Sequence, residues 1–371
     1  MNLIQKSLSE ICTVKTGKRD ANHGNNGGDY TFFTCADKPI LSPTFSFSGE
    51  AIILPGNGAN VGLVLFYDGK FEAYQRTYIL QDFKCDSRFL FYHLKGCWRN
   101  FNANKQFGSA TNYIRMQNFD GYKIPLPPLE EQKRIAKILD KADRIRRKRQ
   151  EAIRLTEELG RSIFLDMFGD PVTNPKGWEK VPLSKIVKGD IRNGLSPSNK
   201  GSYQGNVLTL AAVTQGIFRS SECKSGMFDV IPPENKKVHC SDFLVCRGNG
   251  NINLVGRACF PDQNYQNILF PDTIIGVPID LSVVNQNFLQ TMWDSPLVRR
   301  QIEQQACTTN GTYKINQTTL KNIEILLPDF LLQSKFGESF EAINSIKTKF
   351  SSLIAENLFN SLLQRAFRGE L

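Results

Sequence analysis

The chain has 371 residues, of which 40% are hydrophobic and 26 are Phe, so it can form one large or two ordinary domains and is not disordered. Its formal net charge of +10 points to a polyanionic partner, most often nucleic acid. The first residues lack the apolar core of a signal peptide, and no apolar run has the length of a membrane span. We therefore expect a soluble, cytoplasmic protein.

The nine cysteines are odd in number and form no Cys-x-x-Cys pair, so we expect reduced, packed thiols and neither a disulfide framework nor a zinc site. With only three histidines, a histidine triad or metal cluster is not expected. No Gly-x-x-x-x-Gly-Lys-Ser/Thr loop, nuclease carboxylate cluster or amino-methyltransferase motif is found. The sequence thus predicts a binding protein without a catalytic or metal site.

The first part of the chain contains three landmarks. Leu8-Ser9-Glu10-Ile11 is followed by Gly17. Residues 51–67 place an apolar strand, a Gly-Asn-Gly turn and a second apolar strand in order, which predicts a β-hairpin. Residues 108–132 contain Tyr113 and lead into a long amphipathic segment.

That segment predicts a helix from Leu129 to about Phe168. The preceding prolines block helix formation upstream, and Gly169-Asp170-Pro171 ends it. Its first half carries a run of Lys and Arg. These cations form a solvated face or a partner-docking face, or else contact a DNA backbone.

The landmarks then return in the same order. Leu183-Ser184-Lys185-Ile186 is followed by Gly194, residues 242–260 repeat the Gly-Asn-Gly pattern, and residues 308–333 repeat the tyrosine segment. A second long helix follows Pro328. We therefore predict an α/β (α+β) protein with two similar globular domains and two long helices. The predicted boundaries are 1–126 and 171–327 for the domains, and 127–170 and 328–371 for the helices.

Helices of this length in a soluble chain usually form coiled coils, and an antiparallel pair would place one globular domain at each end. The positions expected to pack between the two helices are Ile135, Ile138, Leu139, Ile145, Ile153, Phe336, Phe340, Ile343, Phe350 and Leu353.

Polar and basic residues gather at equivalent places in both copies. Phosphate contacts require Lys, Arg or backbone N–H groups, and base contacts require polar side chains on rigid supports. The candidates for contacting DNA are Lys15, Lys18, Arg19, Asn22, His23, Arg76, Lys105, Ser109, Thr111, Asn112 and Arg115 in the first copy, and Arg192, Asn193, Ser196, Ser198, Lys200, Arg247, Thr308, Thr309, Asn310, Thr312 and Lys314 in the second. Ordinary polar surface loops would have a similar composition.

Residues 124–143, IPLPPLEEQKRIAKILDKAD, closely resemble the first conserved region of the specificity subunits of type I restriction–modification enzymes. The MFGDP at 167–171, the LLQRAFRGEL at 362–371 and the two-copy layout resemble this family too. The second copy departs from the pattern, because it reads LLPDFLLQ at 326–333 where the first reads PLPPLEEQ at 125–132.

The resemblance implies a subunit that binds a bipartite double-stranded DNA site, with the helices setting the spacing of its two halves. Two methyltransferase subunits and restriction/translocase subunits would join it. S-adenosylmethionine, ATP and Mg²⁺ would belong to those partners. Two alternatives stay open: a reader that is part of a self-contained restriction–methylation enzyme, and a coiled-coil scaffold without DNA.

Overall fold

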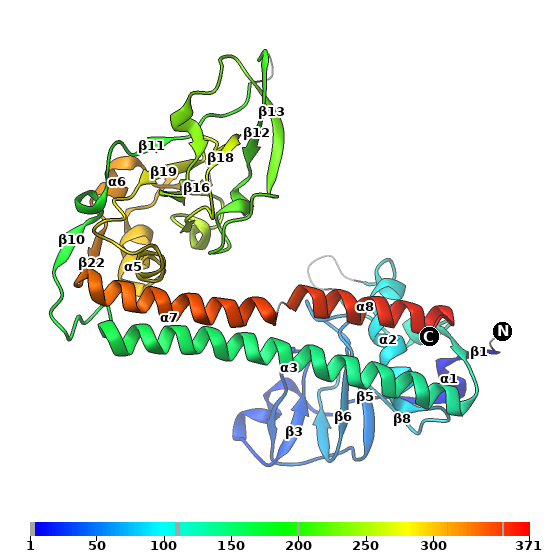
Figure 1. Ribbon diagram of the computed structural model, residues 1–371. Helices are drawn as coiled ribbons and strands as arrows, with labels where there is room; N and C mark the ends of the chain where they lie inside the picture. Colours follow the sequence, from blue (N-terminus) through cyan, green and yellow to red (C-terminus); the bar gives the residue numbers. More distant parts are fainter. Residues whose placement is uncertain (1–3, 108–111, 199–200, 310, 351) are drawn as a thin grey trace. The chain divides into compact units, whose positions relative to one another are not determined.

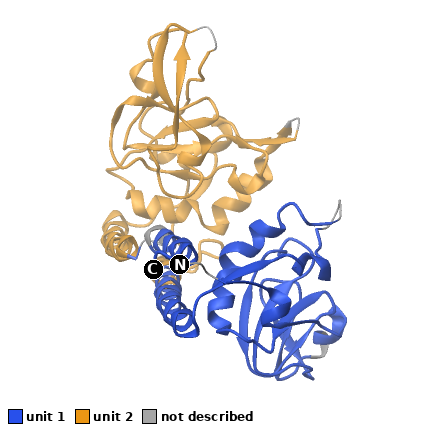
Figure 2. Ribbon diagram, turned by 90° about the vertical axis from the view of Figure 1, so that its right-hand side faces the viewer, with its two compact units in different colours: residues 1–153, 350–371 blue, residues 154–349 orange. Residues whose placement is uncertain are grey.

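The computed structural model describes residues 4–107, 112–198, 201–309, 311–350 and 352–371, without the side chains of 25, 26, 309 and 352–354. The chain forms two compact units (Figure 2). The first unit is Met1–Ile153 with Phe350–Leu371, and the second unit is Arg154–Lys349. The long helix α3, Leu129–Phe168, begins in the first unit and ends in the second (Figure 1).

The first unit packs two sheets and a helix around its core. One sheet is fully antiparallel with the order β2-β8-β5-β6, and the other has the order β4-β3-β7 with β3 and β7 parallel. A separate antiparallel pair joins β1 to β9. The bounds are β1 Ile4–Ser7, α1 Leu8–Ile11, β2 Thr13–Thr16, η1 Ala21–Asn26, β3 Tyr30–Phe33, β4 Ile40–Ser42, β5 Glu50–Pro55, β6 Leu65–Asp68, β7 Phe71–Ala73, β8 Thr77–Gln81, α2 Ser87–Asn102, η2 Met116–Phe119 and β9 Lys123–Leu126.

The second unit repeats this plan. Its antiparallel sheet has the order β11-β19-β15-β17, its mixed sheet has the order β13-β12-β18-β14 with β12 and β18 parallel, and β10 pairs with β22. The bounds are β10 Lys180–Pro182, η3 Leu183–Ile186, β11 Arg192–Asn193, β12 Tyr203–Leu208, η4 Leu210–Ala212, β13 Cys223–Phe228, η5 Glu234–Lys236, β14 Lys237–Val238, β15 Asp242–Cys246, β16 Gly248–Asn249, η6 Ile252–Leu254, β17 Ala258–Cys259, β18 Tyr265–Leu269, β19 Ile274–Pro278, α4 Gln286–Trp293, α5 Pro296–Gln305, β20 Cys307–Thr309, β21 Thr312–Lys314, α6 Gln317–Lys321 and β22 Glu324–Leu326.

The predicted α+β fold with two similar domains is confirmed by this repeated strand order. In detail, the Gly-Asn-Gly segments are not the tight hairpin turns that the sequence predicted. The strands β5 and β6 do pair antiparallel, but the connection between them is long, and its Asn57 bridges to Tyr113. In the second unit Asn249 pairs with Tyr313. The motif therefore joins the hairpin to the tyrosine segment in both units.

A buried glutamine locks the start of a long helix onto the domain in each unit. Gln132 donates from Nε2 to the Pro127 carbonyl at 2.8 Å, and its Oε1 accepts from the Asp86 N–H at 2.9 Å. Gln333 makes the same two bonds, to the Pro328 carbonyl at 2.8 Å and from the Asn285 N–H at 2.9 Å. We call each set of bonds a glutamine clamp. Each clamp satisfies the proline carbonyl just before the long helix and the N–H of the residue that caps α2 or α4, so it joins the starts of two helices.

The helix after Pro328 is interrupted, whereas the sequence predicted one continuous helix. It consists of α7, Phe330–Lys349, and α8, Ser352–Arg368 (Figure 1). Thr348, near the end of α7, is a poor helix former because its hydroxyl competes for backbone hydrogen bonds, and here it donates to the Asn344 carbonyl at 2.8 Å.

Both pieces run antiparallel to α3, as expected. In the first unit Arg146 of α3 contacts Glu356 of α8, while Arg134, nearer the start of α3, contacts the Leu371 carbonyl. In the second unit Glu157 contacts Lys347 of α7, while Phe164, later in α3, contacts Phe336, earlier in α7. Within each unit the contacts therefore run in opposite chain directions.

Some of the predicted packing positions are buried and others are not. Ile135 and Leu139 join the core of the first unit, and Phe336 joins that of the second with Phe340 packed against it. Ile343 is buried beside Gly160, and Ile138 and Ile153 are half-buried.

Two of these expectations were wrong, and one is not described. Ile145 is 45% exposed, because α3 turns its buried face toward both the domain and α8 and leaves Ile145 outside. Phe350 is 37% exposed and lies after the end of α7, so it is not in a helix stripe. The side chain of Leu353 lies outside the described residues. In the part of the chain that the structure describes, no helix is long and apolar enough to cross a bilayer.

Candidate nucleic-acid interface

In the first unit, backbone hydrogen bonds join four segments that are distant in sequence. The Gly17 N–H donates to Thr77 O at 3.0 Å, and the Gly56 N–H donates to Arg76 O at 2.9 Å. The Gly58 N–H donates to Asn112 O at 2.8 Å. We call the loops connected in this way, residues 17–23, 56–58, 74–76 and 112–115, the first loop edge.

The second unit has the corresponding arrangement. The Gly194 N–H donates to Ile274 O at 3.1 Å, and the Arg247 N–H donates to Thr273 O at 2.9 Å. The Ile315 N–H closes the set by donating to Arg247 O at 2.9 Å. We call residues 192–198, 247–249, 271–273 and 312–315 the second loop edge. Three of the predicted groups in each copy thus meet at one place.

A glycine is required at the same point of each edge. A Cβ atom on Gly17 would lie 2.2 Å from the carbonyl oxygens of Ala73 and Tyr74. A Cβ atom on Gly194 would lie 2.0 Å from Phe270 O and 2.2 Å from Pro271 O. Only a residue without a Cβ lets the backbone approach this closely.

The first loop edge carries the more accessible cations. Arg115 lies over the Phe107 ring at 4.6 Å and donates from Nη2 to the Tyr113 hydroxyl at 2.9 Å. Stacking and this hydrogen bond hold the guanidinium in a defined position while the residue remains exposed. Lys18 and Arg76 are exposed as well, and neither makes an ion pair among the described residues. Such side chains are available to a ligand.

Other candidates of the first copy are held by local partners. Lys15 forms an ion pair with Asp82 at 3.3 Å, and Arg19 forms one with the buried Glu72 at 3.3 Å. His23 shares a hydrogen bond with the Thr44 hydroxyl, and Lys105 lies over the Phe101 ring at 3.4 Å. Asn22 and Asn112 are exposed.

In the second copy, Arg192 is a structural residue. Its Nη2 lies 2.5 Å from the buried Asp242 carboxylate, and its Nε donates to Asn235 O at 2.5 Å. Burial raises the pKa of Asp242, and the Arg192 charge opposes that rise. Because both bonds point into the unit, the Arg192 guanidinium links β11 to β15 and is not available to a ligand.

Two of the remaining candidates of the second copy, Ser196 and Arg247, contact Asp272. Its carboxylate accepts from the Ser196 hydroxyl, and its backbone carbonyl accepts from Arg247 Nη1 at 3.2 Å. Asn193 accepts from Gln317 at 3.3 Å. Thr308 and Lys314 are exposed, and Ser198 and Thr312 are half-buried. Ser109, Thr111, Lys200 and Asn310, with the side chain of Thr309, lie outside the described residues.

Two asparagines of the loop edges were not among the sequence candidates. Asn57 and Asn249 lie in the Gly-Asn-Gly segments, beside the tyrosine segments. Amide side chains can both donate to and accept from base edges. The signal was present, because the motif occurs once in each copy, but the hairpin interpretation assigned it to a turn. Among the described residues, no three His, Cys, Asp or Glu side chains could hold a metal ion.

Comparison with known proteins gives a family match for the first part of the chain. Residues 4–155 match the family model "Type I restriction modification DNA specificity domain". The chain is 38% identical over 133 residues to the type I restriction enzyme EcoDI specificity subunit of Escherichia coli, covering 36% of this chain and 29% of that protein. It is 25% identical over 295 residues to the EcoKI specificity subunit of Escherichia coli strain K12, covering 74% of this chain and 63% of that protein.

The chain therefore spans less than two thirds of the length of these two relatives. The crystal structure of the type I restriction–modification S subunit from M. genitalium superposes with a TM-score of 0.69 and 16% identity, covering 99% of this chain and 96% of that one. That likeness establishes the fold. Residues 4–155 are thus similar to the DNA specificity domain of type I restriction–modification enzymes, and the whole chain shares the fold of an S subunit.

Proposed function

We propose that this chain is the DNA-specificity subunit of a type I restriction–modification complex, and that each loop edge reads one half of a bipartite site in double-stranded DNA. The observation that carries this proposal is the pair of equivalent loop edges, each assembled from the same four kinds of segment. Rigid backbone ladders hold these polar loops, as base reading requires. The net charge of +10 supports a polyanionic ligand.

The chain itself would not be catalytic. In this proposal two methyltransferase subunits and restriction/translocase subunits supply the chemistry, using S-adenosylmethionine, ATP and Mg²⁺, and the paired helices set the distance between the half-sites. The relatives' names support assembly in a restriction enzyme, since each is called a subunit of one.

Mapping of methylated bases in DNA tests the proposal. Cells that carry this chain with its methyltransferase subunits should methylate a bipartite motif with an unspecified spacer. Replacing Arg115 by Ala should relax or abolish recognition of one half of that motif, and replacing Lys314 by Ala should affect the other half. Sequence-independent methylation, or methyl transfer by the isolated chain, would contradict the assignment.

A further inference from the structure

The positive charge of α3 is confined to its first half. Residues 133–149 contain nine Lys or Arg and two Asp, whereas residues 150–168 contain two Arg and four Asp or Glu. The boundary between these stretches lies close to Ile153, where the first unit ends. The basic half of α3 therefore belongs to the first unit alone, and its charges act on groups or ligands of that unit.

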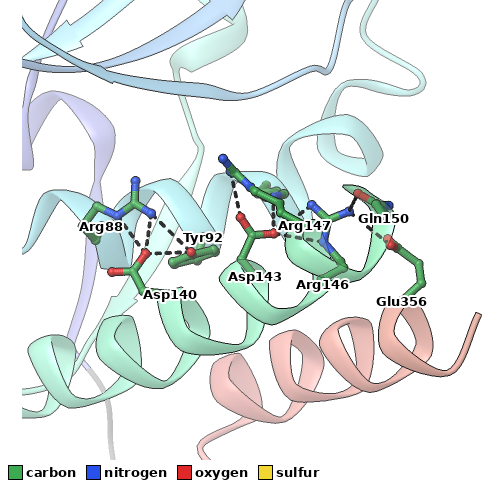
Figure 3. Close-up of polar contacts among 9 residues, drawn as sticks. Arg88, Tyr92, Asp140, Asp143, Arg146, Arg147, Gln150 and Glu356 are labelled. Atoms are coloured by element: carbon green, nitrogen blue, oxygen red, sulfur yellow. Dashed lines mark hydrogen bonds and ion pairs between the residues drawn. The ribbon is translucent and has the colours of Figure 1, made fainter. Parts of the chain in front are cut away.

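Part of this charge is neutralised within the first unit (Figure 3). Asp143, whose side chain is only 3% exposed, lies 2.8 Å from Arg146, 2.7 Å from Arg147 and 3.3 Å from Lys95 of α2. Arg146 also contacts Glu356 of α8 at 3.1 Å. These bonds hold α3 against α2 and α8. They also pair two of the nine cations of residues 133–149, Arg146 and Arg147, with carboxylates.

Asp140 is likewise occupied. It accepts from Arg88 and from the Tyr92 hydroxyl, and the Arg88 guanidinium lies 4.3 Å from the Phe66 ring centre. Both carboxylates in residues 133–149 are thus already paired, so neither is available to neutralise further lysines.

Four other cations form a separate row. Lys137, Lys141, Arg144 and Lys148 are spaced by four, three and four residues, which places them on one face of the helix. All four are exposed, and among the residues that the structure describes none makes an ion pair with them. We call this row the basic stripe. It extends for about 16 Å at about 1.5 Å per residue.

The basic stripe lines a groove of about 1180 Å³ in the first unit. α2 contributes Arg88 and Lys95 to the lining, and the start of β6 contributes Leu65 and Phe66. The segment that leads into β6 begins at Gly56, which belongs to the first loop edge. The groove and the first loop edge are thus joined by one short stretch of chain.

We propose that the basic stripe binds the phosphate backbone of the DNA held by the first loop edge, without reading its sequence. Phosphates are contacted chiefly by Lys and Arg, and a row about 16 Å long faces roughly five phosphates of one strand at about 3.4 Å each. A protein partner is the less favoured occupant, because lysine is depleted at protein interfaces while three of these four residues are lysines. This inference rests on the proposed function, since it assumes that DNA is bound.

The test compares salt dependences of DNA binding by the full chain assembled with its methyltransferase subunits. One variant replaces the four stripe residues by Gln, which retains helix propensity. The control replaces four other exposed lysines, Lys123, Lys180, Lys185 and Lys188, by Gln and so changes the net charge equally. The probes are a duplex containing the mapped motif and a duplex of the same length without it.

A plot of log K against log salt has a negative slope, and the stripe variant should make that slope less steep by about 3 to 4, at about 0.9 per lost phosphate contact. Between 50 and 200 mM salt this corresponds to a change of about 100-fold in the affinity ratio of wild type to variant. The loss should be equal for both duplexes, and the control should retain the wild-type slope.

An unchanged slope in the stripe variant would overturn the inference while leaving the proposed function intact. If that variant kept the slope but no longer assembled with the methyltransferase subunits, the stripe would be a protein-docking surface instead. Absence of motif-specific binding by the wild-type assembly would refute the proposed function itself.

Discussion

Removing one glutamine clamp should destabilise one unit and leave the other unchanged. In Gln132→Ala, the Pro127 carbonyl and the Asp86 N–H lose their partners at 2.8 and 2.9 Å. Each unsatisfied buried group costs about 1–3 kcal/mol, and both groups are only partly buried, so we expect a loss of about 2–4 kcal/mol. With a urea m-value of about 2 kcal/mol/M, the midpoint of the first unit should fall by about 1–2 M.

Amide hydrogen exchange in urea, read peptide by peptide, measures this loss separately for each unit. Peptides of α2 and β5 should lose protection in Gln132→Ala, while peptides of β15 and α4 should not. Gln333→Ala should give the reverse pattern, because its clamp binds Asn285. Gln150→Ala is the matched control, since Gln150 is exposed and accepts only from Arg146 at 3.4 Å. Equal loss of protection in both units, or a midpoint shift no larger than that of the control, would refute the reasoning.

Four further predictions concern the charges, the glycines and the helices. Burial lowers the pKa of His93 to about 4, whereas its pKa in the unfolded chain is about 6.5, so the unfolded chain binds the proton first on acidification. The stability of the first unit should therefore fall by up to about 3 kcal/mol as the pH drops from about 6.5 to about 4. A His93→Gln variant, measured by urea titration, should lack this pH dependence. Burial alone would raise the pKa of Asp143, but the Arg146 hydrogen bond and the Lys95 charge outweigh burial and lower this pKa. The carboxylate therefore stabilises the folded state at pH values above its unfolded pKa of about 3.9, and this stabilisation is lost on further acidification. Asp143→Asn should cost about 2 kcal/mol at pH 7 in the same titration, and a variant as stable as wild type would contradict the network. Gly17→Ala and Gly194→Ala should each disturb methylation of a different half-site because of the 2.0–2.2 Å contacts, whereas Gly250→Ala, whose Cβ would meet no atom within 4 Å, should not. Inserting seven residues into both long helices should lengthen the spacer of the methylated motif, and an unchanged spacer would rule out the helices as the spacing element.

The sequence by itself determined the features that depend on local signals. The order of landmarks predicted the repeated fold, and the prolines before Leu129 and the glycine after Phe168 predicted the ends of α3. Gly17 and Gly194 were recognisable because each follows a Leu-Ser-x-Ile landmark, and the structure shows that each lies against a neighbouring backbone. Proline, glycine and a helical period restrict the chain wherever they occur, so they can be recognised without knowing the fold.

Only the tertiary structure decided which polar residues remain available to a ligand. Arg192 is an equally good DNA candidate in sequence, but Asp242, fifty residues later, takes up its guanidinium. Arg146 and Lys141 belong to the same basic run, yet one is bonded to Asp143 and Glu356 and the other faces the groove. Ile145 fits the apolar stripe and is nevertheless exposed, since α3 packs on two neighbours at once. Whether a charged side chain is paired or exposed depends on groups that folding brings together, so it cannot be read from the spacing of residues along the chain.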